Sequence, residues 1–328
     1  METKVEKIDE NSLRTAAHLI RIGELVAFPT ETVYGLGANA FDEAAVKKIY
    51  ETKGRPSNNP LIAHVHAQYD ISSLIDRDPP YAAALRKAFL PGPLTMVYPS
   101  TKKVAPSVSA GLNTLAIRVP SHAGAQAFLR AVNLPIVAPS ANLSKHVSPT
   151  SAEHVFADFA GKISLILDGG ASEGGIESTV LDVTGEVPLI LREGLITREM
   201  IASVAGKCEK YFLKDGEQAK SPGMMYKHYA PRCETLLFDS LPEALAAYHA
   251  KEEAGKRVWL LTGGKWLEQL PPIRLLSLGA CPKDMAANLY KQLRAGEIMA
   301  DCIVALVPAE RGGIMAGVLD RLTRACRS

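Results

Sequence analysis

Four basic residues stand at positions where a charge needs a partner. Arg118 lies inside the apolar segment LAIRV, and Arg192 lies inside LILRE. A guanidinium on a buried strand must meet an internal carboxylate or an anionic ligand, because burying an unpaired charge is costly. Lys53 and Arg55 stand together in KGRP, where they could complement the negative end of a helix or clamp a phosphate. Together these residues suggest a site for anions.

Small polar side chains stand at the ends of three predicted strands. The segment PTETVYGLG (29–37) offers three hydroxyls beside two glycines, and glycine allows a backbone to approach a ligand closely. The segments SAN (140–142) and EST (177–179) stand at comparable places. Each could be no more than a polar turn. Open α/β sheets nevertheless bind ligands at strand ends, so the three segments could also line one site.

Motifs that mark other chemistries are absent from the sequence. It contains no GxxxxGK[ST] phosphate loop, no HExxH and no GxSxG. Residues 35–40 fit the relaxed dinucleotide pattern GxGxxA, but residues 57–60 lack the acidic side chain expected about 20 residues later. His64 and His66 share one face of a predicted strand, as metal ligands could, yet packed or substrate-binding histidines fit as well. The residues alone indicate a site for a phosphorylated compound.

The elements that would position these residues follow from hydrophobic periodicity. Helices are expected over 12–22, 43–53, 79–89, 122–132, 151–159 and 197–205, and strands over 25–30, 61–66, 94–99, 114–120, 136–140, 164–169, 178–183 and 189–193. Some strands follow others without a helix between them, which predicts a mixed sheet.

The amino-acid composition changes after residue 206. Residues 207–233 are polar and rich in glycine and proline, which predicts a linker. Beyond it, strands over 234–240, 257–264, 273–279 and 302–308 alternate with helices over 242–254, 283–295 and the C-terminal segment. This alternation predicts a small Rossmann-like open sheet. The expected division is therefore 1–206, 207–233 and 234–328.

Composition excludes several classes of protein. The 328 residues are 47% hydrophobic and 22% charged, too apolar for disorder, and the net charge of +2 argues against a chain that mainly coats nucleic acid. No apolar run could span a membrane, and the mixed-charge N-terminus does not resemble a secretory signal. The five cysteines form no CxxC pair, so we expect neither disulfides nor zinc, and a cytoplasmic location.

Eight motifs in order carry a family resemblance. They are PTETVYGLG, KGRP with NNPLIAHV, LPGPLT, LAIRVP, APSAN, ESTVLD, ILREG and SPGMMYKHYAP, spread over residues 29–231. The chain resembles the YrdC-type L-threonylcarbamoyladenylate synthases that carry an added C-terminal domain. The resemblance implies a YrdC-like twisted mixed-sheet α/β domain and a reaction of L-threonine, bicarbonate (as carbon dioxide) and ATP. The products would be threonylcarbamoyl-AMP and pyrophosphate.

The resemblance also implies roles for individual residues. The threonine site would contain Thr32, His64, Arg118, Ala138 and Ser178. The catalytic group around the phosphates would contain Lys53, Arg55, Ser140 and Asn142. Further ATP contacts would come from Asn59, Thr114, Ser148, Arg192 and Tyr229, with residues 221–231 as a lid. Magnesium would arrive with ATP, so no side-chain metal ligands are expected.

The resemblance implies partners too. The product would feed N6-threonylcarbamoyladenosine formation on tRNAs that read codons beginning with A, through a separate tRNA threonylcarbamoyl transferase. A weak contact with tRNA is a further expectation, and no membrane is involved.

Three positions depart from the family pattern. Lys145 stands where glycine is frequent, Glu193 where proline is frequent, and Met225 where a basic residue is common. Lys227 keeps the second basic residue of this linker.

Other functions remain open from the sequence. The chain could be an RNA-binding module of the YrdC-like type without turnover. A carbamoyl-phosphate-dependent transferase of the hydrogenase-maturation type would also need an acylphosphatase-like segment and zinc fingers, which this sequence lacks. In the C-terminal part, the glycine pairs 263–264 and 312–313 fit either turns or a binding cleft. We expect that part to hold the lid.

Overall fold

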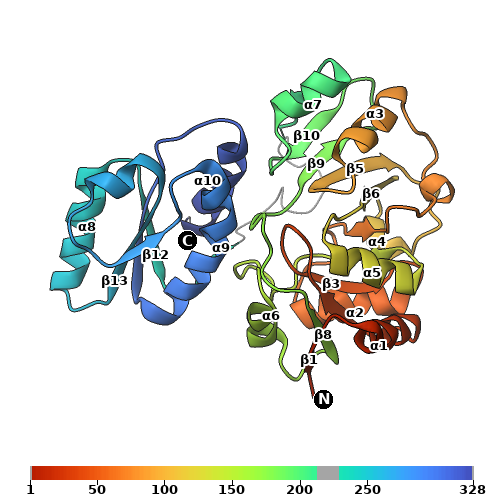
Figure 1. Ribbon diagram of the computed structural model, residues 1–328, viewed down its shortest axis with the longest axis horizontal. Helices are drawn as coiled ribbons and strands as arrows, with labels where there is room; N and C mark the ends of the chain where they lie inside the picture. Colours follow the sequence, from red (N-terminus) through yellow and green to blue (C-terminus); the bar gives the residue numbers. More distant parts are fainter. Residues whose placement is uncertain (1, 213–228, 327–328) are drawn as a thin grey trace.

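The computed structural model describes residues 2–212 and 229–326. These residues form two α/β units, each built on its own sheet (Figure 1). The elements of the first unit are β1 (Lys4–Lys7), α1 (Glu10–Arg21), β2 (Val26–Phe28), β3 (Gly35–Asn39), α2 (Glu43–Lys53), β4 (Ile62–His64), η1 (Ile71–Ser73), α3 (Pro80–Phe89), β5 (Leu94–Pro99), α4 (Pro106–Ser109), β6 (Thr114–Arg118), α5 (Ala123–Val132), β7 (Ile136–Val137), α6 (Ala152–Phe159), β8 (Leu165–Asp168), β9 (Thr179–Asp182), β10 (Leu189–Arg192), α7 (Arg198–Ala205) and β11 (Glu209–Lys210).

The larger sheet is mixed, as the sequence predicts. Its strand order among the described residues is β1-β8-β2-β3-β7-β4-β6-β5-β9-β10-β11. Strands β4 and β6 run parallel, whereas β5 pairs antiparallel with β6 and parallel with β9. Parallel and antiparallel neighbours thus alternate irregularly, which brings the end of β4, the end of β6 and the start of β5 to one place.

The two faces of this sheet are covered differently. Buried residues of α2, α3, α6 and α7 belong to the apolar core on one face, and α1 and α5 pack with β2, β7 and β8 on the other. Over β4, β5, β6, β9 and β10 the second face carries only a small cluster of Ile62, Val97, Ala116, Val180 and Leu191. The residues of the functional site lie on this part of the sheet.

The second unit is a parallel four-stranded sheet with the order β12-β15-β13-β14. Its elements are β12 (Glu234–Phe238), α8 (Leu241–Glu253), β13 (Val258–Thr262), η2 (Gly264–Gln269), β14 (Leu275–Ser277), α9 (Pro282–Met299), β15 (Cys302–Leu306) and α10 (Ile314–Cys326). Helices α9 and α10 face the first unit (Figure 1). The predicted open-sheet C-terminal fold is confirmed.

Several elements differ from their predicted bounds for local reasons. Helix α1 begins at Glu10 because Asp9 and Ser12 form a capping box, with Asp9 Oδ1 2.8 Å from the Ser12 amide nitrogen. Strand β1 escaped prediction because KVEK has charged residues on an exposed edge rather than an apolar pattern. Residues 209–210 lie in the expected linker, yet they extend the larger sheet as β11.

The dinucleotide pattern at residues 35–40 is not a Rossmann turn. Residues 35–39 form β3, which pairs antiparallel with β2 and β7. The glycines permit close packing in the sheet, since a Cβ on Gly37 would lie 2.8 Å from Ile136 Cγ2 and 3.1 Å from Phe28 Cε1. The pattern therefore reflects packing against these side chains.

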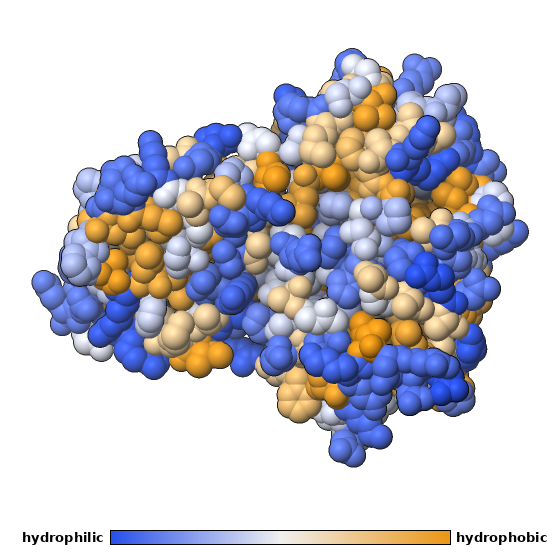
Figure 2. All heavy atoms as spheres, viewed as in Figure 1, coloured by the Kyte–Doolittle hydropathy of each residue, from blue (hydrophilic) through white to orange (hydrophobic). Residues whose placement is uncertain are grey.

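Hydrophilic and hydrophobic residues are interspersed over both units on the face shown in Figure 2. Within residues 2–212 and 229–326, none of the helices combines the length and apolar character that a membrane span requires.

Candidate functional site

Strand register places the central site residues in a row. His64 on β4 is the register partner of Arg118 on β6, and Arg118 is the partner of Thr95 on β5. Thr95 Oγ1 lies 2.8 Å from Ser178 Oγ, just before β9. Because side chains two apart share a face, His64 and Arg118 lie on the same face as Ile62 and Ala116.

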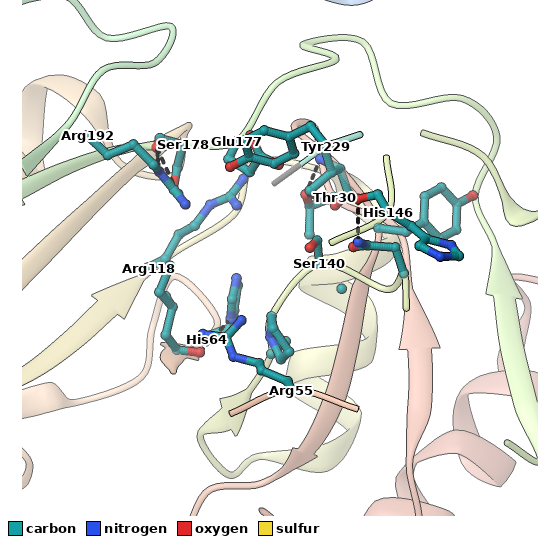
Figure 3. Close-up of a pocket in the computed structure, with 17 residues that line it drawn as sticks. Thr30, Arg55, His64, Arg118, Ser140, His146, Glu177, Ser178, Arg192 and Tyr229 are labelled. Atoms are coloured by element: carbon teal, nitrogen blue, oxygen red, sulfur yellow. Dashed lines mark hydrogen bonds between the residues drawn. The ribbon is translucent and has the colours of Figure 1, made fainter. Parts of the chain in front are cut away.

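This row borders a cavity of about 660 Å³, including its open mouth. Residues from distant parts of the chain converge on it, with Glu177, Ser178, Arg192 and Tyr229 along the upper wall in Figure 3 and Arg55 and His64 below them. The lining residues are Thr30, Val33, Tyr34, Gly35, Arg55, Ile62, His64, Arg118, Ala138, Pro139, Ser140, Asn142, His146, Glu177, Ser178, Arg192 and Tyr229.

Nine of the predicted site residues line this one cavity. They are Arg55, His64, Arg118, Ala138, Ser140, Asn142, Ser178, Arg192 and Tyr229. The sequence places them between positions 55 and 229, so only the fold brings them together.

Five predicted residues do not line the cavity. Thr32 is buried with Oγ1 2.9 Å from Thr30 Oγ1, and Ser148 Oγ donates to Glu177 Oε1 at 2.7 Å. The carbonyl of Asn59 accepts hydrogen bonds from Tyr50 and Arg55. Thr114 begins β6, four residues before Arg118. Lys53, the fifth, is described next.

Lys53 lies beneath the SAN segment. Its Nζ donates to the Ser140 carbonyl at 2.6 Å and to the Asn142 carbonyl. Burial lowers the pKa of the Lys53 ammonium well below its usual value. The ammonium therefore supports the loop that carries Ser140 and Asn142, and its contact with phosphate stays a prediction.

Arg118 meets the internal carboxylate that the sequence left open as one of two alternatives. One terminal nitrogen pairs with Glu31 Oε1 at 2.8 Å, and both side chains are largely buried, at 5% and 12% exposed. Its Nε is also buried and has no hydrogen-bond partner among the described residues. An internal carboxylate thus orients the guanidinium, and the buried Nε stays available to a ligand.

Arg192 is held against the start of β9. Its Nε and a terminal nitrogen donate to the Ser178 carbonyl at 3.1 and 3.0 Å, and the same terminal nitrogen lies 3.2 Å from Ser178 Oγ (Figure 3). Burial, reinforced by nearby Arg321, lowers the pKa of Arg192. These contacts fix a cation and a hydroxyl side by side in the wall.

His64 is a neutral side chain in this environment. Burial, with Arg118 nearby, lowers its pKa to about 3. Nδ1 lies 3.1 Å from the Ile62 carbonyl, so Nδ1 carries the proton and donates it. His64 therefore contributes hydrogen bonding and shape rather than charge.

Three lining residues carry buried polar atoms that lack a partner within the described ranges. These atoms are Arg55 Nε, Arg118 Nε and Asn142 Oδ1. Burial lowers the pKa of Arg55 to about 10, which leaves the group charged at neutral pH. Buried polar groups are almost always hydrogen-bonded in folded proteins, so atoms left unpaired around one cavity point to a polar ligand.

Two carboxylates of the site lie in segments that the sequence analysis singled out, but it gave these carboxylates no role of their own. Glu31, within PTETVYGLG, pairs with Arg118, and Glu177, within ESTVLD, lines the cavity. The guanidinium in LAIRV could have signalled a carboxylate partner, but no local pattern identifies one 87 positions away. His146, another lining residue, gave no signal in the sequence.

The departures from the family pattern have local explanations where they are described. Lys145 has φ of 73°, the left-handed region that glycine adopts most easily, and its carbonyl accepts from the Ala230 amide at 3.0 Å. Glu193 pairs with Lys210 at 3.4 Å. Met225 and most of the expected lid, residues 221–228, lie outside the described residues, whereas Tyr229 is buried in the cavity wall.

The site lacks a protein metal centre within the part of the chain that the structure describes. No three His, Cys, Asp or Glu side chains there lie close enough to hold a metal ion. His66 lies beyond β4, where its Nε2 is 3.0 Å from Asn133 Oδ1.

Comparison with known proteins gives matches over nearly the whole chain. A family model described as Telomere recombination (Sua5/YciO/YrdC) matches residues 18–194, and one described as the C-terminal domain of threonylcarbamoyl-AMP synthase matches residues 196–326. The threonylcarbamoyl-AMP synthase of Bacillus subtilis is 43% identical over 340 residues, covering 99% of this chain and 98% of the relative. That of Pyrococcus abyssi is 41% identical over 331 residues, covering 98% and 95%.

One solved structure is similar to this chain in both sequence and fold. The crystal structure of P. abyssi Sua5 complexed with L-threonine matches with a TM-score of 0.90 and 41% identity, over 99% of this chain and 97% of that chain. The chain therefore belongs to the threonylcarbamoyl-AMP synthase family, in the form with a Sua5/YrdC domain and an added C-terminal domain.

Proposed function

We propose that this chain joins L-threonine, carbon dioxide from bicarbonate, and ATP into threonylcarbamoyl-AMP and pyrophosphate in the cavity described above. The observation that carries the proposal is the set of unpaired buried atoms on Arg55, Arg118 and Asn142 around one cavity. It is supported by the likeness to a protein solved with L-threonine and to full-length relatives named as synthases.

Threonine would occupy the end of the cavity at β4 and β6. Arg118 Nε would bind its carboxylate in a charge-assisted hydrogen bond. His64 and Ser178 stand in the same row, and the backbone at Ala138 lies beside them in the lining. Thr32 would act from behind, through its contact with the cavity residue Thr30.

ATP would occupy the part bordered by Arg55, Ser140, Asn142, Arg192 and Tyr229. Two arginines there can neutralise phosphate charge. Magnesium would enter as MgATP and screen the leaving pyrophosphate. Asn59, Thr114 and Ser148 lie behind or beside this part, and their roles as ATP contacts belong to the same proposal, as does the support of Ser140 and Asn142 by Lys53.

The chemistry requires alignment rather than a protein nucleophile. The threonine amine adds to carbon dioxide, releases a proton to solvent and forms a carbamate. A carbamate oxygen then bonds to the α-phosphorus of ATP while the bond from that phosphorus to the β-phosphate bridge breaks, and pyrophosphate leaves. The chain's residues hold two anions in register and offset their repulsion before reaction.

The product is an activated carbonyl that water would hydrolyse, so a second enzyme must consume it. We propose a tRNA threonylcarbamoyl transferase as the acceptor, with N6-threonylcarbamoyladenosine on tRNA as the outcome. Any tRNA contact by this chain itself would be weak, given the net charge of +2.

The test is pyrophosphate release from ATP with the complete mixture and with threonine or bicarbonate omitted. We expect release only in the complete mixture, together with threonylcarbamoyl-AMP detected by mass spectrometry. Release that is indifferent to threonine would overturn the proposal. Tight, salt-sensitive RNA binding without turnover would favour the RNA-binding module, which the names of the full-length relatives already disfavour.

A further inference from the structure

Glu177 poses an electrostatic problem in the proposed site. It is a buried carboxylate in the wall of a cavity that takes anions, with its side chain 8% exposed. Ser148 Oγ donates to Oε1 at 2.7 Å, which satisfies one oxygen. An unneutralised carboxylate here would repel phosphate, so the second oxygen needs a positive or donating partner.

The second unit supplies those partners. Tyr290 of α9 donates its hydroxyl to Glu177 Oε2 at 2.8 Å, and Arg321 Nε of α10 pairs with the same oxygen at 3.1 Å. Both side chains are fully buried. Two helices of the second unit thus complete the hydrogen bonding of a residue in the cavity of the first.

These contacts also determine the charge of the carboxylate. The charged and titratable groups that face Glu177 are Arg192, Tyr229, Tyr290 and Arg321. Burial alone would raise the pKa of Glu177. The two arginines and the hydrogen bonds from Ser148 and Tyr290 outweigh it, and the pKa lies below its usual value.

The same two side chains reach further parts of the wall. The Tyr290 ring packs on the Tyr229 ring, with centroids 5.3 Å apart and planes at 31°. A terminal nitrogen of Arg321 donates to the Glu193 carbonyl at 2.6 Å, next to Arg192. Tyr290 and Arg321 therefore contact Glu177, Tyr229 and the backbone beside Arg192 together.

We infer that Tyr290 and Arg321 are positioning residues for the ATP side of the cavity, acting through Glu177 and Tyr229. The second unit then contributes side chains that hold residues of the ATP site in position. The inference rests on the proposed function, because it takes ATP as the ligand of this wall.

A simpler role would be adhesion between the units, and another contact separates the two roles. Arg232, just before β12, pairs with Asp158 of α6 at 3.7 Å, and its amide donates to Glu297 Oε1 of α9 at 2.9 Å. This contact joins the same units, and neither Arg232 nor Asp158 lines the cavity. Removing the Arg232 side chain should weaken the interface and leave Glu177 with its partners.

The experiment compares Tyr290→Phe and Arg321→Lys in the full chain with the unaltered protein. Phenylalanine keeps the ring against Tyr229 and removes the donor to Glu177. We expect KM for ATP to rise about tenfold, as for loss of one hydrogen bond to a charged group, with KM for threonine changed by less than about twofold. The acid limb of kcat/KM should move to higher pH, because Glu177 loses a group that favours its ionised form.

Two control variants accompany the test. Arg232→Ala should lower Tm slightly with KM for ATP unchanged. Arg257→Ala removes an exposed ion pair with Asp301 within the second unit and should also leave KM for ATP unchanged. The inference is overturned if Tyr290→Phe and Arg321→Lys lower only Tm, or if Arg232→Ala raises KM for ATP equally. Should Arg321→Lys not fold, Tyr290→Phe decides alone.

Failure of the proposed function would be recognised separately. If the unaltered chain releases no threonine-dependent pyrophosphate, the function fails, and calorimetric titration of MgATP into the same variants still tests the wall. If the unaltered chain and Tyr290→Phe then bound MgATP with equal affinity, the inference would be overturned.

Discussion

Arg118 shows how one side chain can be both structural and available to a ligand. Glu31 takes one terminal nitrogen at 2.8 Å, while Nε stays buried without a partner among the residues described. The carboxylate fixes the guanidinium in place before any substrate arrives, so binding needs little reorganisation. The buried Nε is the donor that the carboxylate of threonine would meet in the proposed reaction.

Replacing Arg118 with alanine should therefore affect threonine far more than ATP. We expect KM for threonine to rise about 10- to 100-fold, since a hydrogen bond to a charged group contributes about 1.5–3 kcal/mol. KM for ATP should change little in steady-state pyrophosphate assays. Arg130→Ala, at an exposed position on α5, is the matched control and should behave as the unaltered chain. Equal increases in both KM values would show that Arg118 does not bind the threonine carboxylate.

His64 predicts a pH dependence of stability. Its pKa is about 3 in the folded chain and about 6.5 in an unfolded one, so the unfolded chain binds more protons between these values. Stability contributed by neutral His64 is therefore lost as pH falls through this window, by at most about 1.4 kcal/mol per pH unit. Denaturant unfolding of His64→Gln between pH 4 and 6 should show a shallower slope than the unaltered chain.

His66→Gln is the control for this measurement, because His66 stands two residues later outside β4 and only half-buried. Its stability should keep the slope of the unaltered chain. Parallel pH curves for the unaltered chain and His64→Gln would contradict the neutral, buried state of His64.

At the scale of elements, the sequence predicts strands well where they are apolar and poorly where they are exposed or short. LTMVYP and TLAIR are buried strands as expected, because central strands carry continuous apolar runs. Strand β7 covers only residues 136–137 of the predicted 136–140. Pro139 in that segment has no amide hydrogen for a ladder bond.

The site shows the same division between local and long-range information. Arg55, His64, Arg118 and Ser178 could be selected from their segments, and the structure places them around one cavity. Glu177 could not be assigned, since its partners Tyr290 and Arg321 stand 113 and 144 positions later. Ion pairs between units depend on packing that no local pattern encodes.

A glycine just after β10 (Leu189–Arg192) packs closely against the segment that leads into β9. A Cβ on Gly194 would lie 2.4 Å from the Thr179 amide nitrogen and 2.8 Å from the Glu177 carbonyl oxygen, and neither backbone atom can yield easily. Gly194→Ala should therefore push the Glu177–Ser178 segment away from β10. We expect a loss of about 1–3 kcal/mol in unfolding free energy and lower turnover, measured by denaturant unfolding and pyrophosphate release.

Gly185→Ala, in the connection between β9 and β10, provides the matched comparison. The nearest neighbour of a Cβ there is the Val187 carbonyl oxygen at 3.9 Å, an ordinary contact. Stability and turnover should stay close to those of the unaltered chain. If both alanine variants behaved alike, close approach at Gly194 would not be what holds the start of β9 in place.

At the scale of the whole molecule, the two units share one apolar cluster. Val33, Val147 and Ile176 from the first unit belong to the same buried cluster as residues of α9 and α10. A Cβ on Gly175 would lie 2.3 Å from the Ala286 carbonyl oxygen of α9, which shows how closely the units approach. The boundaries 1–206, 207–233 and 234–328 stay predictions, and the shared cluster argues that the units stabilise each other.

Ending the chain just before Ser221 should consequently impair both stability and turnover. Removal of α9 and α10 exposes Val147 and Ile176 and leaves Glu177 without Tyr290 and Arg321. We expect residues 1–220 to keep their helix and strand content in circular dichroism, with a lower Tm than the full chain. Pyrophosphate release should remain poor even well below that Tm, because the shortened cavity wall also lacks Tyr229. Full turnover by the shortened chain would mean that the first unit builds its ATP wall alone.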